Sequence, residues 1–227
     1  MINTQLPRYF ERNVQFIKER MEKQIKDSLS RGNSYIDREL QNPLFFLIRP
    51  AIKAFYNNIT KPQLERGSKN NLKLCLEVAK EKIINPEIDV DELIDKHFNQ
   101  YLKGDQTASA LNKKHPNYPW FVENTRRIFK AQIIPLIKML KCEEPASNYD
   151  ELSVKTFKTP EIARKTLSEQ LDLMYDGIKK IESDMSILNL PVGRDILITV
   201  LKKGFQDTRE ELIGDIDVIF RKYGDVN

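Results

Sequence analysis

The spacing of apolar residues in the last third of the chain constrains the fold most strongly. From Leu167 to Leu188 they recur at alternating intervals of four and three residues, the spacing of a coiled-coil helix. After Pro191 a second stripe runs from Leu197 to Tyr223 in an eleven-residue repeat, close to the period of a straight helix. The pattern predicts a long antiparallel helical hairpin over residues 159–227. Its candidate helix-packing or partner-binding positions are Leu171, Ile178, Met185, Leu201, Leu212 and Ile219.

The two stripes differ in period, so they cannot remain in register along their whole length. Other helices are therefore expected to share the seam, and any excess stripe to bind a partner or a second copy, because large exposed apolar patches are unfavourable in water. We expect Ile178 and Leu212 to be buried and Asp176 to face solvent.

The first two thirds of the chain also show helical periodicity. Gly32 is expected to end the first helix, Pro50 to kink or split the helix that contains it, and Pro135 to kink its own helix. The predicted helices cover residues 6–29, 34–41, 43–57, 62–84, 89–104 and 119–141. Only 8 glycines are present, fewer than an all-β chain needs for its turns. The fold is therefore predicted to be all-α, a multi-helix bundle that ends in the hairpin.

Residues 143–158 show no clear period and form the candidate boundary between an N-terminal helical domain, residues 1–144, and the C-terminal hairpin, residues 159–227. The two units can also pack as one bundle. The most apolar run, residues 43–56, contains Arg49 and Lys53 and is too short to span a bilayer, so no transmembrane segment is predicted. Within it, residues 44–48 are predicted to be buried core. The first residues lack the layout of a signal peptide, and two cysteines do not make a disulfide framework. A cytoplasmic protein is expected.

No motif for catalysis, cofactor binding or metal binding is found in the sequence. His97 and His115 lack the spacings of helical metal sites, and neither a Gly-rich phosphate loop nor a G-x-S-x-G element occurs. Cys75 lies on an apolar stripe and is predicted to be a core residue. We therefore predict no cofactor, no metal and no local catalytic site.

Charge is distributed unevenly along the chain. Residues 1–60 carry ten basic and six acidic side chains, whereas residues 181–227 carry six basic and nine acidic ones. A basic N-terminal half can attract nucleic acid or an anionic surface. Basic side chains beside an aromatic ring supply the candidate nucleic-acid contacts, which are Lys113, Lys114, Trp120, Arg126, Arg127 and Lys130. Any such binding is expected to be weak, independent of sequence and sensitive to salt.

The leading hypothesis is a non-enzymatic helical interaction or scaffold protein that binds a partner protein, or a second copy, through helical surfaces. The first alternative is the binding of nucleic acid or an anionic surface by the basic N-terminal half. The second is a helical-bundle enzyme whose site residues come from distant positions, with Asp172, Asp176, Asp184 and Asp195 as candidate acids.

Overall fold

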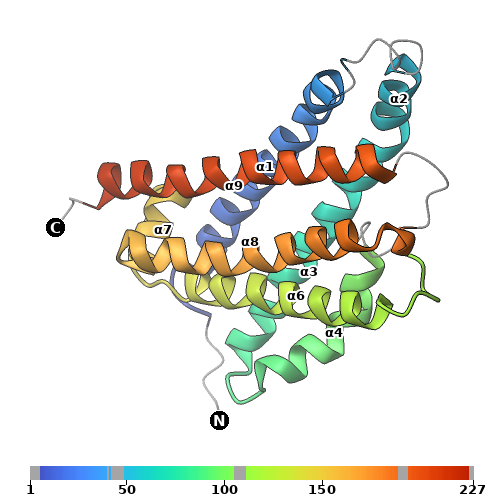
Figure 1. Ribbon diagram of the computed structural model, residues 1–227. Coiled ribbons are helices and arrows are strands. Elements are labelled where there is room, and N and C mark those ends of the chain that lie inside the picture. Colours follow the sequence, from blue (N-terminus) through green and yellow to red (C-terminus); the bar gives the residue numbers. More distant parts are fainter. Residues whose placement is uncertain (1–5, 40, 42–48, 105–110, 189–193, 225–227) are drawn as a thin grey trace.

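The computed structural model describes residues 6–39, 41, 49–104, 111–188 and 194–224 (Figure 1). It is 84% helical, so the prediction of an all-α multi-helix bundle is confirmed. In the described ranges the only strand-like pairing is an isolated bridge between Leu111 and Leu188. None of the helices built from these residues is both long enough and apolar enough to cross a lipid bilayer.

The described helices follow one another in chain order. Their bounds are α1 Phe10–Glu39, α2 Arg49–Phe55, the π-helical turn η2 Tyr56–Thr60, α3 Lys61–Ile84, α4 Val90–Gly104, α6 Tyr118–Leu140, α7 Tyr149–Phe157, α8 Pro160–Ser183, the 3-10 turn η3 Met185–Ile187, and α9 Arg194–Tyr223. The predicted helices over 62–84, 89–104 and 119–141 are confirmed to within one residue at each end.

Helix α1 continues through Gly32, so the predicted end at this glycine and the separate helix over 34–41 are wrong. A Cβ atom at Gly32 would lie only 2.0 Å from the hydroxyl oxygen of Tyr56. That hydroxyl donates a 2.7 Å hydrogen bond to the carbonyl of Leu29. The glycine therefore makes room for a neighbouring ring and does not terminate the helix.

The predicted helix over 43–57 is described only from Arg49 onward, and the apolar run 44–48 lies outside the described residues. Pro50 occupies the first turn of α2, where its missing N–H has no intrahelical partner to lose. Pro135 is buried within α6, and the helix continues past it to Leu140.

The main core is formed by α1, α3, α4, α6 and α7, with the first turns of α8 and the last turns of α9. Phe129 and Ile133 of α6 are fully buried there, and the ring of Phe129 stacks on Tyr101 of α4 at a centroid distance of 4.2 Å. Asn13 lies in the same core, and its Nδ2 donates to the carbonyls of Met139 and Cys142 at 3.1 Å each. The carbonyl groups at the end of α6 are thereby satisfied inside the protein.

The segment without clear period, residues 143–158, contains α7. Its first N–H groups are capped by Asn148, whose Oδ1 accepts a 3.0 Å hydrogen bond from the backbone of Glu151. Leu152 and Phe157 of α7 join the same buried cluster as Ile133 of α6 and Ile216 of α9. The segment therefore packs against helices on both sides of it in the sequence. The division into units 1–144 and 159–227 stays a prediction.

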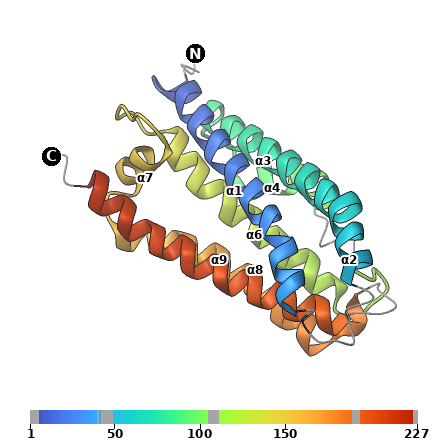
Figure 2. The ribbon, with the colours of Figure 1, turned by 90° about the horizontal axis from the view of Figure 1, so that it is seen from above.

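Helices α8 and α9 run side by side in opposite directions, and α8 lies between α6 and α9 (Figures 1 and 2). Thr159 caps α8, and its hydroxyl accepts from the N–H of Ile162. The helix ends at Ser183, so the predicted continuation of its heptad to Leu188 is wrong. Asp184 instead caps the turn η3, and Leu188 packs in a second, smaller cluster. That cluster consists of Leu111, Phe121, Ile181, Ile187, Leu188 and Ile198.

Helix α9 crosses α1, and three ion pairs bridge the two helices (Figure 1). Arg20 pairs with Asp215 at 3.5 Å, and Arg38 pairs with Asp207 at 3.2 Å. Between them Arg31 pairs with Glu211. The basic start of the chain and its acidic end are thus brought together, which accounts for part of the uneven charge of the sequence.

Candidate interaction groove between α6 and α8

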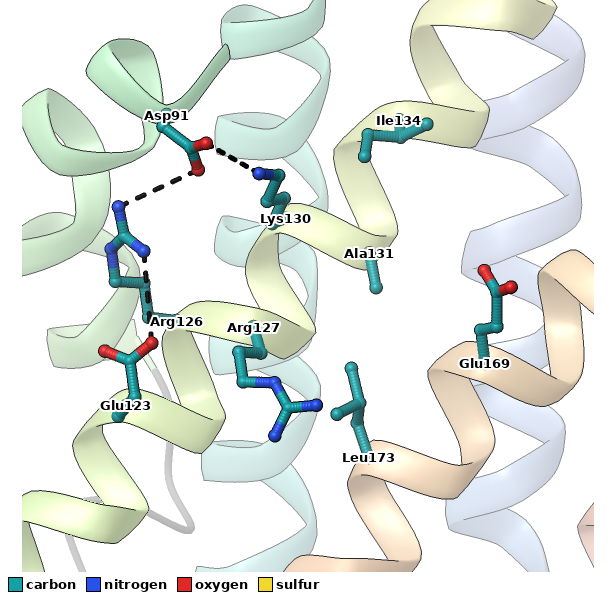
Figure 3. A pocket seen from close by; sticks show the side chains of 9 residues that line it. All are labelled: Asp91, Glu123, Arg126, Arg127, Lys130, Ala131, Ile134, Glu169 and Leu173. Carbon is teal, nitrogen blue, oxygen red and sulfur yellow. Dashed lines mark hydrogen bonds and ion pairs between the residues drawn. The ribbon is translucent and has the colours of Figure 1, made fainter.

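A shallow, open groove of about 750 Å³ runs along the solvent face of α6, between α4 on one side and α8 on the other (Figure 3). Its lining combines charged and apolar side chains from three helices. These are Asp91 of α4, Glu123, Arg126, Arg127, Lys130, Ala131 and Ile134 of α6, and Glu169 and Leu173 of α8.

Helical spacing brings the central lining residues together. Arg127, Ala131 and Ile134 are four and three residues apart, so they share one face of α6. Glu169 and Leu173 are four residues apart and share one face of α8. The two helices are joined at one end of the groove, where Nδ2 of the buried Asn124 donates a 2.9 Å hydrogen bond to the carbonyl of Leu173. Beyond this point Lys180 lies over the ring of Trp120, with 5.9 Å from Nζ to the ring centroid.

On the α4 side of the groove the basic side chains are already paired. Arg126 binds Asp95 at 2.8 Å, and this bond raises the pKa of the guanidinium above its usual value. Lys130 donates a 2.7 Å hydrogen bond to Asp91, which lowers the pKa of that carboxyl. Arg126 also lies 3.8 Å from Asp91. Because acids of α4 neutralise both bases, this wall presents little net charge.

On the α8 side, two charges of opposite sign have no ion-pair partner among the described residues. Arg127 extends beside Leu173, and Glu169 stands on the opposite helix (Figure 3). Both residues are exposed. Between them lie Ala131 and Leu173, both half-buried, and Ile134, which is 38% exposed. The groove therefore has an apolar floor with a cation and an anion at its edges that are unpaired within the described part of the chain.

The six residues proposed as nucleic-acid contacts are placed in two groups. Arg126, Arg127 and Lys130 line the groove, but only Arg127 is unpaired within the described chain. Lys113 and Lys114 are exposed in the connection before α6 and do not line it. Trp120 is 38% exposed, whereas the adjacent Phe121 is buried in the second cluster. The structure thus gathers some of these residues, but beside acids.

The six residues proposed as a packing or partner surface are mostly used inside the molecule. Leu171 is buried, and Ile178, Leu212 and Ile219 are half-buried. Met185 packs against the second cluster. The expected burial of Ile178 and Leu212 is therefore only partly met. Asp176 is exposed, as predicted, and pairs with Lys179 at 3.8 Å. Leu201 is the exposed member of the set, at 39%.

Leu212 lines a second cleft, of about 500 Å³, between α1 and α9. Met21, Ile25 and Leu29 of α1 contribute apolar side chains to this cleft. The paired residues Arg20, Asp215, Arg31 and Glu211 also line it. Two ion pairs therefore bridge the two helices across this cleft, and the charged residues Lys23 and Asp27 also line it.

One polar cluster combines histidine, serine and aspartate. The N–H of Asn117 donates to Nδ1 of His115 at 3.1 Å, so the neutral ring carries its proton on Nε2. That nitrogen lies 2.8 Å from the hydroxyl of Ser186 and 3.1 Å from Asp184. The Ser186 hydroxyl in turn donates to Asp184 at 2.6 Å. A general base for serine needs an unprotonated nitrogen facing the hydroxyl, with its other nitrogen held by the acid. This arrangement instead ties the turn after α8 to the connection before α6.

Cys75 and His97 are two further residues considered for chemistry. Cys75 is buried in the main core, and burial raises the pKa of its thiol to about 12, which opposes nucleophilic reactivity. His97 contacts Glu81 at 2.9 Å. No group of three or more His, Cys, Asp or Glu side chains with metal-binding geometry occurs among the described residues.

Sequence reasoning did not identify Ala131, Ile134, Glu169 or Leu173 as a set, because only the packing of α8 beside α6 brings them together. One signal for the groove was present. The helix at 119–141 is apolar around half its circumference, more than one core contact requires, and Ile134 lies in that excess.

No family model, curated protein or solved structure matches this chain.

Proposed function

We propose that this chain is a non-enzymatic helical interaction protein, and that the groove between α6 and α8 is the surface that binds its partner protein. The observation that carries this proposal is the exposed apolar floor of the groove. Ile134 is exposed on this floor, to which the half-buried Ala131 and Leu173 also contribute. Charged side chains surround the floor, as at protein interfaces with an apolar centre and a polar rim.

The shape of the groove suits a partner helix. Two helices packed side by side leave a furrow between them, into which a third helix can lay its apolar face. Burying apolar surface contributes about 25 cal/mol per Å², so even a small floor favours association once water is excluded. A second copy of the chain would satisfy the same argument as a different partner protein.

Several observations favour protein over nucleic acid as the partner. Arg126 and Lys130 are neutralised by acids of α4. Three arginines of α1 are paired with acids of α9. Nucleic-acid binding depends on basic side chains that are free to contact phosphate groups. Because these bases are paired, we favour a protein over nucleic acid as the partner. We propose a cytoplasmic location because both cysteines are free.

The proposal is tested by affinity capture from native lysate, with and without nuclease treatment, followed by quantitative mass spectrometry. Ile134→Glu places a charge on the groove floor, whereas Leu201→Glu makes the same change on α9 at nearly equal exposure, 39% against 38%. We expect a protein that is captured by the parent and by Leu201→Glu but lost with Ile134→Glu. Loss with Leu201→Glu alone would place the binding surface on α9. Capture that disappears on nuclease treatment would favour the nucleic-acid alternative.

A further inference from the structure

We infer that the occupant of the groove is a single amphipathic helix of a partner protein that carries both signs of charge beside its apolar stripe, an acidic side chain facing Arg127 and a basic one facing Glu169. This inference rests on the proposed function and specifies the chemistry of the partner.

The length of the groove floor sets the length of the helix that can occupy it. From Arg127 to Ile134 the face of α6 extends seven residues, about 10 Å at 1.5 Å per residue. The whole lining on α6, from Glu123 to Ile134, extends eleven residues, about 16 Å. A helix of about 15 residues, roughly four turns, covers this distance. Its contacting side chains would recur at intervals of three and four residues.

The two edges of the groove carry opposite charges. Arg127 comes from α6 and Glu169 from α8, and they lie on either side of Leu173 and Ala131 (Figure 3). Neither side chain has an ion-pair partner among the described residues, although Arg126 and Lys130 do. An occupant that covers the floor also removes water from beside these two charges. It loses affinity unless it supplies an opposite charge to each of them.

The two edges disfavour a partner helix whose flanks carry only one sign of charge. A helix with acids on both flanks would meet Glu169, and a helix with bases on both flanks would meet Arg127. Like charges held close together oppose association, so the groove selects against both. A mixed-charge helix satisfies both edges. It does so in only one of the two directions, because reversing a helix exchanges its two flanks.

The test uses three labelled peptides of about 15 residues, the length set by the rise of a helix. All are alanine-rich and carry the same leucine stripe. They differ only in the flanks, which are glutamate and lysine, lysine on both sides, or glutamate on both sides. Binding to the full chain is measured by fluorescence anisotropy for the parent, for Arg127→Glu and for Glu169→Lys.

The parent should bind the mixed peptide most tightly. Arg127→Glu, whose edges are both acidic, should prefer the lysine peptide, and Glu169→Lys should prefer the glutamate peptide. Each change of rank is expected to be about threefold or more, the size of a partly exposed charge pair. Arg66→Glu on α3 and Glu210→Lys on α9 change the net charge equally at exposed positions outside the groove, and should leave the parent's order unchanged.

The same rank order in all proteins, or no binding of any peptide, would overturn the inference. Arg127 and Glu169 are exposed, so substitutions at these positions should leave the fold intact. Thermal melts that match the parent's verify that each variant is folded. If the lysate partner depends on Ile134 but the peptides show no dependence on residues 127 and 169, the proposed function stands and the mixed-charge occupant is wrong. If the partner does not depend on Ile134, the proposed function itself fails.

Discussion

Arg31 of α1 donates two parallel hydrogen bonds to the carboxylate of Glu211 of α9, and the second of them is 2.9 Å long. This pairing raises the pKa of Arg31 and lowers that of Glu211. Both side chains are more than a third exposed, so solvent screens the attraction. The pair therefore orients α9 on α1 more than it stabilises the fold.

A double-mutant cycle at this pair should give a coupling of about 0.5–1 kcal/mol at low salt, the range of exposed pairs with good geometry. Arg31→Ala, Glu211→Ala and the double variant are compared by urea unfolding. In 1 M salt, where the screening length falls to about 3 Å, the coupling should approach zero. A coupling that persists in high salt would show that the pair is shielded from solvent.

Gly32→Ala should destabilise the protein, although alanine favours a helix by about 1 kcal/mol over glycine. The new methyl group would overlap the Tyr56 hydroxyl and break its hydrogen bond to Leu29. A net cost of about 1–3 kcal/mol is expected from the displaced ring and the lost bond. Gly214→Ala in α9 is the control, because its added Cβ meets nothing within 4 Å and should stabilise. Equal stabilisation by both changes would show that Tyr56 does not approach Gly32 in solution.

Glu151 should contribute to the acid sensitivity of the fold. Hydrogen bonds from Lys155 and Ser147 lower its pKa from 4.5 to about 2. A carboxyl whose pKa is lowered by folding stabilises the protein above its unfolded pKa, and this stabilisation is lost as the pH falls from 4.5 towards 2. Glu151→Gln should therefore reduce the pH dependence of unfolding in this window, measured by urea denaturation at several pH values. An unchanged pH dependence in Glu151→Gln would contradict the hydrogen bonds from Lys155 and Ser147.

The two cysteines should differ in their reaction with a thiol reagent. Cys142 is partly exposed, whereas Cys75 is 3% exposed and burial raises its pKa to about 12. One thiol per chain should react in the native protein, and the second only after unfolding. Mapping of the modified peptide by mass spectrometry identifies the site. Rapid labelling of Cys75 would contradict the packing of α3 against α6.

Much of the fold could be predicted because local chemistry and apolar periodicity agree. Thr159 and Pro160 begin α8 as a cap and a first-turn proline, and the stripe of α3 has the period of its helix. The prediction failed where tertiary contacts overrule local preference. Gly32 lies within α1, where its missing side chain leaves room for the ring of Tyr56. Helix α7 was not predicted because nine residues are too few to show a clear period, although Leu152, Val154 and Phe157 are all buried.

The candidate site could be predicted only in part. Arg127 and Trp120 are conspicuous in the sequence, but as nucleic-acid contacts. The acids that neutralise Arg126 and Lys130 come from α4, more than 30 residues earlier, and Glu169 comes from α8. No local pattern links these positions, because helix packing alone brings them together. Whether each charged side chain is neutralised within the protein therefore depends on neighbours that are distant in the sequence.

Site-specific photo-crosslinking tests the central claim most directly. A photoreactive amino acid is placed at residue 134 in the groove or at residue 201 on α9, two positions of nearly equal exposure. After irradiation in native lysate, residue 134 should cross-link to a helical segment of one protein, either a partner or a second copy, and residue 201 should not. Cross-links from residue 201 and none from residue 134, or cross-links from residue 134 to nucleic acid, would contradict the account.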